Sequence, residues 1–248
     1  MATYKKRGFK GKVKPNRLEE IENKSTTANV LKSLDDGSSK TQVWVEKNQN
    51  KILTLIGMVV ITLASYYAYT NFVVEPNEKN AANEIYFSQQ KFEEALPMEN
   101  DSIFDIALNG ENDNLGFIEL ADKFSGTRAG NLANYYIGMI YLKKNDYQNA
   151  IKYLSNFESN DIMLSSISLG SIGDAFSELN QYVEAYEFYT KAYSVSNNNY
   201  TTPIYLFKSG IIALELGKFS SALDNFTKIK YEYSDSPQAK NIDVYISK

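Results

Sequence analysis

Three stretches in the second half of the chain resemble one another, and this internal repeat constrains the fold more than any other feature. They read IGMIYLKKNDYQNAIKYL, IGDAFSELNQYVEAYEFY and SGIIALELGKFSSALDNF. In each, a Gly precedes an Ala by 12 residues, which pairs Gly138 with Ala150, Gly173 with Ala185 and Gly210 with Ala222. The alanines are 35 and 37 residues apart. A period of this size is typical of a solenoid built from stacked helical hairpins.

The repeated positions have a physical interpretation. Turn-forming residues at Asn145, Asn180 and Gly217 separate each stretch into a helix A and a helix B. The small Gly and Ala allow the two helices to approach closely. A large residue four positions after the Ala then fills the groove between them; these residues are Leu154, Tyr189 and Phe226. The pattern therefore predicts three helical hairpins over residues 131–236.

In these three registers the sequence resembles the tetratricopeptide repeat family, whose period is about 34 residues. It departs from the usual pattern at Asn134, Ser209 and Ala213. The resemblance implies an all-α fold with a tetratricopeptide-repeat α-solenoid, and an unrelated bundle of α-hairpins is the alternative.

We expect a degenerate helical cap over residues 75–130, with helices at Asn80–Leu96 and Leu115–Phe124 and an irregular loop at Pro97–Asn114. A C-terminal capping helix is expected over residues 237–248.

In the family that the repeats resemble, the inner face of helix A usually lines a concave groove that binds peptides. Mapped by register, the protein-binding candidates are Leu132, Tyr135, Met139, Leu142, Ile167, Asp174, Ile204, Phe207, Ile211 and Leu214. The subgroup that clamps a terminal carboxylate has polar residues where this chain has Tyr135 and Met139. The resemblance therefore implies a groove for hydrophobic or helical segments. The alternative for each candidate is a place in the core between helices.

The composition argues against catalysis. The chain has no Cys and no His, which excludes thiolate ligands, an imidazole base and His-based zinc sites. No pair of carboxylates stands out from the acidic surface, although an enzyme that uses Asp, Glu or Lys is the remaining catalytic alternative. We therefore expect a protein that is not an enzyme and has no cofactor and no metal site.

A stretch without any charged residue lies between Lys51 and Glu75. Its 23 residues, Ile52–Val74, exceed the about 20 that a helix needs to cross a bilayer. We predict a single N-terminal transmembrane helix within residues 39–74. A buried core helix and a cleaved signal peptide are the alternatives. The 51 mostly hydrophilic residues in front of the stretch favour an uncleaved anchor.

Charge is distributed unevenly along the chain. Residues 1–51 contain 12 Lys and Arg against 6 Asp and Glu, whereas the rest contains 14 against 24. The positive-inside rule places the basic end in the cytoplasm. Residues 1–38 are thus expected to form a disordered cytoplasmic tail of a bacterial inner-membrane protein, with the repeats in the periplasm. The tail is interpreted as a topology determinant. Contact with anionic lipid or with the ribosome is the alternative, and no other nucleic-acid binding is expected.

The order of basic tail, membrane helix and acidic repeats resembles that of the YfgM-like ancillary subunits of the bacterial Sec translocon. The stretch LGFIELADKFSGTRAGNLANYYIGMIYL, Leu115–Leu142, is similar to the Bacteroidetes-type members. The resemblance implies a scaffold and co-chaperone whose partners are the Sec channel, a membrane-anchored periplasmic chaperone and secreted clients. A scaffold of another envelope complex, for outer-membrane secretion, gliding or cell-wall assembly, is the alternative function. An organellar import receptor would need its repeats in the cytosol, against the charge rule.

Overall fold

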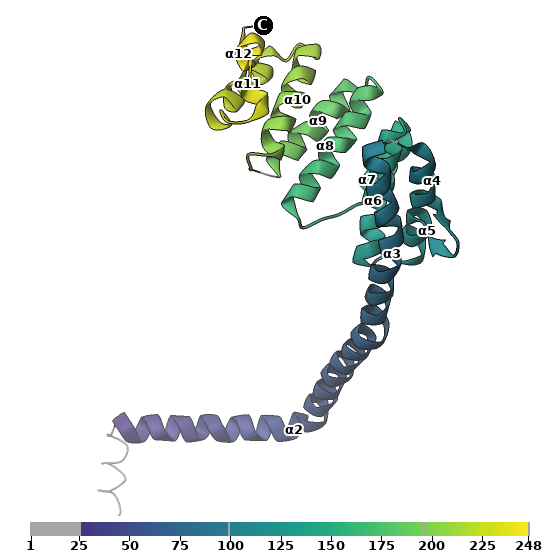
Figure 1. Cartoon of the computed structure of the whole chain (residues 1–248). Helices are drawn as coiled ribbons and strands as arrows, with labels where there is room; N and C mark the ends of the chain where they lie inside the picture. The colour runs from purple at the N-terminus through teal and green to yellow at the C-terminus, as the bar shows by residue number, and fades with distance from the viewer. Residues whose placement is uncertain (1–25, 99, 196, 248) are drawn as a thin grey trace, which may run out of the picture. The chain divides into compact units, whose positions relative to one another are not determined.

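The computed structural model describes residues 26–98, 100–195 and 197–247, and most of them are helical (Figure 1). The chain divides into two compact units, Met1–Tyr69 and Thr70–Lys248. The all-α expectation is confirmed, with one two-stranded hairpin as the small addition.

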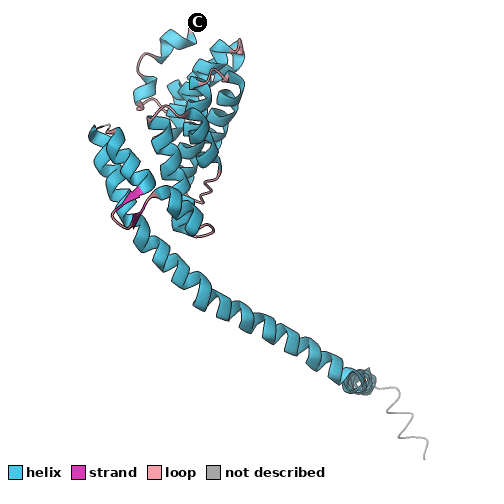
Figure 2. Ribbon diagram, turned by 90° about the vertical axis from the view of Figure 1, so that its right-hand side faces the viewer, coloured by secondary structure: helices cyan, strands magenta, loops and turns pink. Residues whose placement is uncertain are grey.

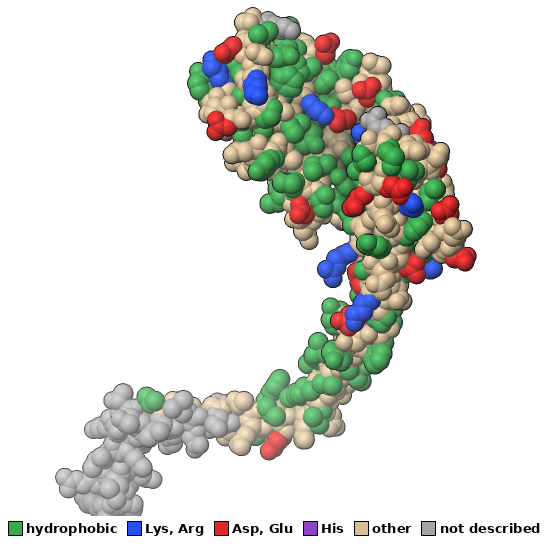
Figure 3. All heavy atoms as spheres, viewed as in Figure 1, with side chains coloured by type: hydrophobic (Ala, Val, Ile, Leu, Met, Phe, Trp, Pro, Cys, Tyr) green, Lys and Arg blue, Asp and Glu red, His purple; other side chains and the backbone are tan. Residues whose placement is uncertain are grey.

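Over its described residues, the first unit consists of one long helix, α2 (Thr26–Tyr69). Its apolar side chains lie on the surface (Figure 3), and Leu53, Met58 and Ile61 are each 57 to 66% exposed. No part of the described protein covers them, which is how a helix that contacts lipid is built. Among the described residues, one helical segment, from Thr41 onward, is long and apolar enough to cross a membrane.

The structure contradicts part of the prediction of a disordered tail over residues 1–38. Residues 1–25 lie outside the described residues. The prediction is wrong for residues 26–38, because α2 already begins at Thr26. Adding residues to an existing helix avoids the cost of nucleation, and Gly37 costs only about 1 kcal/mol there relative to Ala.

The second unit starts with a π-helical turn, η1 (Thr70–Val74), followed by α3 (Glu75–Ala95). Pro76 lies in the first turn of α3. Proline donates no backbone hydrogen bond, and its ring clashes with the carbonyl four residues earlier, which belongs to Phe72. The wider π turn accommodates both effects. The helix predicted at Asn80–Leu96 lies within α3 apart from its last residue, and α3 begins five residues earlier than predicted, at Glu75.

Helix α3 packs against α4 (Asp101–Asn109), α5 (Phe117–Lys123) and α6 (Arg128–Lys143). Their shared core includes the fully buried Phe117 and Ile137, together with Phe104 at 2% exposure. A 3-10 turn, η2 (Leu96–Met98), precedes α4. Strands β1 (Gly110–Glu111) and β2 (Asn114–Leu115) form an antiparallel hairpin after it (Figure 2).

The prediction of an irregular loop over Pro97–Asn114 is therefore wrong. The segment is too rich in Asn, Asp and Gly to suggest a helix, but the Asn100 side chain caps α4 by accepting hydrogen bonds from the backbone of Ser102 and Ile103. Burial of Phe104 against the core then stabilises this short helix, which local propensity alone does not predict.

Three helical hairpins follow, as the repeat pattern predicts, although their helices span residues 128–232 and not 131–236. They are α6 with α7 (Tyr147–Ser155), α8 (Ile162–Glu178) with α9 (Tyr182–Ser194), and α10 (Thr201–Glu215) with α11 (Phe219–Glu232). The predicted turn residues Asn145, Asn180 and Gly217 all have left-handed backbone, with φ of 60°, 57° and 70°. Asn and Gly tolerate this conformation best.

The small-residue contacts inside the hairpins are also confirmed. A Cβ placed on Gly138, Gly173 or Gly210 would lie 2.5, 2.7 or 2.5 Å from a side-chain carbon of the large residue on the paired helix B. Those large residues are Leu154, Tyr189 and Phe226, respectively. The glycines thus set the distance between helix A and helix B in all three hairpins.

The chain ends with η3 (Pro237–Ala239) and a short α12 (Ile242–Ile246). The expected single capping helix is interrupted at Asn241, whose φ of 63° is left-handed. Ile242 is 3% exposed and packs into the core of the third hairpin, so this end still covers the last repeat.

Candidate functional site

An open cleft of about 800 Å³ runs along the first helices of the three hairpins, α6, α8 and α10. The apolar lining comes from Met139 and Leu142 on α6, and from Phe207, Ile211 and Ile212 on α10. Helix α8 supplies four of the nine polar lining residues. The remaining lining residues are Lys143, Asn145, Tyr147, Ser171, Asp174, Ser177, Glu178, Tyr189 and Lys208.

Helical spacing explains why these side chains share one surface. Ser171, Asp174 and Ser177 follow one another at intervals of three residues on α8, and Phe207 and Ile211 are four apart on α10. Other faces of the same helices lie in the core, where Ala175 and Ala213 are fully buried. Helix A thus has one face in the cleft and another in the core.

The structure brings together five of the ten candidate residues: Met139, Leu142, Asp174, Phe207 and Ile211 line the cleft. The other five lie outside its lining. Leu132 packs against the core of α3–α6, Ile204 against the core of the second and third hairpins, and Leu214 against the third. Ile167 is half-buried on α8.

Tyr135, the fifth candidate outside the cleft, packs against other aromatic rings. Its ring lies 5.6 Å from that of Tyr136 and 5.2 Å from that of Phe157. It therefore closes the packing between α6 and the segment after α7 and does not line the cleft. That the five cleft residues bind a partner stays a prediction.

Sequence reasoning missed the most specific polar contact of the cleft. Lys208 Nζ donates to Asp174 Oδ1 at 2.6 Å and to Oδ2 at 2.8 Å, and the Tyr189 hydroxyl donates to Oδ1 at 2.6 Å. A signal for this pair exists in the sequence. Lys208 is the one basic residue of α10, and Asp174 is one of two acidic residues in α8.

Burial changes the chemistry of the tyrosines behind this pair. Tyr189 is 3% exposed, and burial together with the neighbouring Asp174 carboxylate raises the pKa of its hydroxyl. Burial also raises the pKa of Tyr205, which stacks on Tyr189 with the ring centroids 6.3 Å apart. Both hydroxyls stay protonated at neutral pH, so Tyr189 acts as a permanent hydrogen-bond donor to Asp174.

Comparison with known protein families decides the nature of these hairpins. The tetratricopeptide repeat family model matches residues 133–156 and 168–199, which cover most of the first two hairpins. The chain carries tetratricopeptide repeats. No curated protein and no solved structure gives a significant match to it. The third repeat lies outside the matched residues but keeps the same contact of Gly210 with Phe226.

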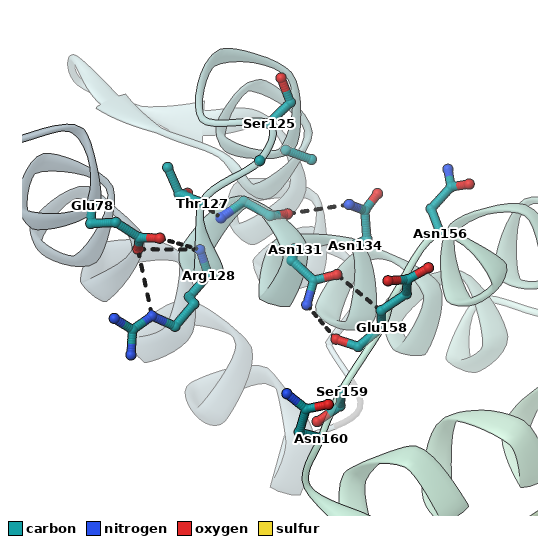
Figure 4. A pocket seen from close by; sticks show the side chains of 13 residues that line it. Glu78, Ser125, Thr127, Arg128, Asn131, Asn134, Asn156, Glu158, Ser159 and Asn160 are labelled. Carbon is teal, nitrogen blue, oxygen red and sulfur yellow. Dashed lines mark hydrogen bonds and ion pairs between the residues drawn. The ribbon is translucent and has the colours of Figure 1, made fainter. Parts of the chain in front are cut away.

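A second cavity of about 610 Å³ lies beside the first repeat (Figure 4). Here Glu78 of α3 accepts hydrogen bonds from the backbone N–H of Arg128, at 3.2 Å to each oxygen. Asn131 donates to the carbonyl of Glu158 at 2.6 Å and accepts from its N–H at 3.0 Å. These polar groups bind one another, so they brace the N-terminal end of α6.

Because the chain has no His and no Cys, acidic side chains are the remaining side-chain candidates for metal ligands among the described residues. Over these residues, no group of three or more acidic side chains lies close enough to hold a metal ion. The side chains of the main cleft are instead those of a binding surface with apolar walls and a paired charge.

Proposed function

We propose that this protein is a membrane-anchored scaffold of the bacterial inner membrane that presents its repeats in the periplasm and binds proteins there. It works beside the Sec translocon as a co-chaperone, and its repeats receive a membrane-anchored chaperone or emerging secreted proteins. The repeats act by binding and not by catalysis. The cleft along α6, α8 and α10 is the observation that carries the proposal.

The cleft supports a binding role because its lining combines apolar walls on α6 and α10 with polar side chains between them on α8. Met139 and Leu142 stand on one side, and Phe207 and Ile211 on the other. All four are only half-buried, so apolar area is still available to a partner. Tetratricopeptide repeats, as stacked helical units, bind partners along such extended surfaces.

The anchor and its orientation are supported by the exposed apolar surface of α2 and by the charge asymmetry. The excess of Lys and Arg before residue 52 favours a cytoplasmic N-terminus. The translocon assignment is supported by the resemblance of the overall order and of Leu115–Leu142 to YfgM-like subunits. That resemblance makes the Sec channel the first partner to test.

Mild-detergent purification of tagged full-length protein, followed by mass spectrometry, tests the proposal. We expect the Sec channel and a periplasmic chaperone to co-purify with the wild type. Two variants test the cleft. Phe207→Glu places a charge on its apolar wall, and Ser177→Arg places a large side chain among its polar residues. Tyr231→Glu is the control, since Tyr231 is 74% exposed and does not line the cleft.

Loss of the chaperone from both cleft variants, with retention by the Tyr231 variant, is the supporting result. Recovery of an outer-membrane or cell-wall complex without Sec would overturn the translocon assignment. Retention of every partner by both cleft variants would overturn the role of the cleft. Circular dichroism of each variant shows whether it is folded before its partners are compared.

A further inference from the structure

The charges that line the main cleft balance. Lys143 and Lys208 are its basic residues, and Asp174 and Glu178 are its acidic ones. At the cleft centre, Lys208 and Asp174 neutralise each other through two short contacts of 2.6 and 2.8 Å. At this centre a charged partner gains little net attraction, which favours a neutral partner there.

The central pair is held in place from several directions. Tyr189 donates to the Asp174 carboxylate, and the Lys208 ammonium lies 5.8 Å from the ring centroids of both Tyr189 and Tyr205. Two aromatic rings, a hydroxyl and the opposite charge thus hold the two groups before any partner arrives. A preorganised pair costs less to use in binding than two mobile side chains.

The pair also keeps some hydrogen-bonding capacity. A carboxylate accepts about four hydrogen bonds and an ammonium donates three. Among the described residues, the hydrogen bonds in place are three to Asp174 and two from Lys208. The Lys208 and Asp174 side chains are 38% and 30% exposed. By this count, one accepting position of Asp174 and one N–H of Lys208 remain for a ligand.

We propose that the cleft binds an uncharged, apolar stretch of another polypeptide in extended form, and that Asp174 and Lys208 together hold its main chain. This inference rests on the proposed binding function of the cleft and names the chemistry of its ligand. An extended chain offers free N–H and C=O groups to the remaining acceptor and donor, whereas a helix has already paired its own. The apolar walls on α6 and α10 receive the side chains.

The same pair rejects charged residues at this point of the ligand. An acidic side chain would meet the Asp174 carboxylate as well as the Lys208 ammonium, and a basic one would meet the ammonium as well as the carboxylate. Each would therefore gain little net attraction from the neutralised pair. Each would also lose solvation next to apolar walls, which costs free energy unless a new partner compensates. A terminal carboxylate is disfavoured for the same reason, because the ammonium that would receive it is already neutralised.

A peptide-binding experiment on full-length protein in lipid nanodiscs tests the inference, with empty nanodiscs as the blank. Three fluorescent apolar peptides, blocked at both ends, differ only in a central Ala, Lys or Glu. Fluorescence anisotropy should show the wild type binding the Ala peptide about tenfold more tightly than either charged peptide.

Substituting either member of the pair should change which peptide binds most tightly, and the two substitutions should favour peptides of opposite charge. Asp174→Asn leaves Lys208 uncompensated, so the Glu peptide should gain affinity. Lys208→Met leaves Asp174 uncompensated, so the Lys peptide should gain. The double variant should restore the preference for Ala. Lys230→Met is the matched control, since it removes a Lys that pairs with Asp243 at 2.7 Å outside the cleft and should change nothing.

An unchanged ranking in both single variants would overturn the inference. The proposed function would still stand in that case if Ser177→Arg abolished binding of all three peptides. Absence of peptide binding by the wild type, while protein partners still co-purify, would likewise overturn the extended apolar ligand and leave the scaffold role intact. If the wild type neither bound the peptides nor co-purified with any partner, both the inference and the proposed function would be overturned.

Discussion

Lys208 on α10 donates hydrogen bonds to both carboxylate oxygens of Asp174 on α8, although the two residues are 34 positions apart in the sequence. The pair links the first helices of the second and third repeats inside the cleft. Tyr189 on α9 donates to the same carboxylate. One acidic side chain therefore connects three helices, and changes around it report on both stability and binding.

Tyr189 gives the repeats a dependence on alkaline pH. The ordinary tyrosine pKa is 10.0, and burial beside Asp174 raises that of Tyr189 in the folded protein. Above about pH 10 the unfolded chain loses this proton and the folded protein keeps it, so the stabilisation is complete below pH 10 and is lost as pH rises beyond it. We expect the free energy of unfolding to fall by up to about 1.4 kcal/mol per pH unit from this residue. Urea unfolding followed by circular dichroism measures it.

The matched variant for this prediction is Tyr189→Phe, which keeps the ring and cannot ionise. Its free energy of unfolding should fall less steeply above pH 10, although it should be lower at neutral pH because Asp174 loses a donor. The same alkaline slope in both proteins would contradict the prediction.

Gly210→Ala should destabilise the third repeat. Its Cβ would lie 2.5 Å from the Phe226 ring, which is fully buried and has no space to move away. Overpacking of this kind costs about 1–3 kcal/mol, and a domain of this size loses about 2–4 °C in Tm per kcal/mol. Gly37→Ala is the control, because no atom lies within 4 Å of the added carbon. Equal Tm values for the two variants would show that the close approach is not required.

Asn131→Ala should loosen the segment between α7 and α8. The wild-type side chain makes two hydrogen bonds to the backbone of Glu158, and losing them costs about 1–2 kcal/mol of local stability (Figure 4). Cleavage by a glutamate-specific protease at Glu158 should become about tenfold faster. Asn134→Ala is the matched control, because Asn134 donates only within its own helix, to the Gly130 carbonyl. Similar cleavage rates for both variants would contradict the bracing role.

The proposed orientation can be tested by single cysteines, since the chain has none of its own. Asn160→Cys lies between α7 and α8, and Ser39→Cys lies on α2 before the apolar stretch. In intact spheroplasts, a membrane-impermeant maleimide should label Asn160→Cys. It should reach Ser39→Cys only after the membrane is permeabilised. The opposite labelling pattern would place the repeats in the cytoplasm.

Much of the scaffold follows from local sequence patterns. The turn residues Asn145, Asn180 and Gly217 mark where each hairpin reverses, and the spacing of Gly and Ala identifies the helix contacts. These signals work because backbone conformation and close packing each depend on one or two residue types. Helix α4 escapes such reasoning, since burial of Phe104 among distant residues stabilises it more than its own propensity does.

The candidate site was only half predictable for a related reason. Helical register identifies which residues of helix A share a face, but the face spans both cleft and core. Tyr135 is drawn into packing with Tyr136 and Phe157, whereas Met139, one turn later, reaches the cleft. That division depends on how neighbouring helices pack, which a repeat pattern does not contain.

The sequence by itself determined the repeats, their turns and a helix long and apolar enough for a membrane, because these depend on spacing and on the length of an apolar stretch. Only the tertiary structure decided which helix A residues meet in the cleft and that Lys208 neutralises Asp174 there. Such contacts join residues that are distant in the chain, and their distances are set by the packing of α8 on α10. The charge balance of the cleft, and with it the proposed ligand, is a property of the folded repeats.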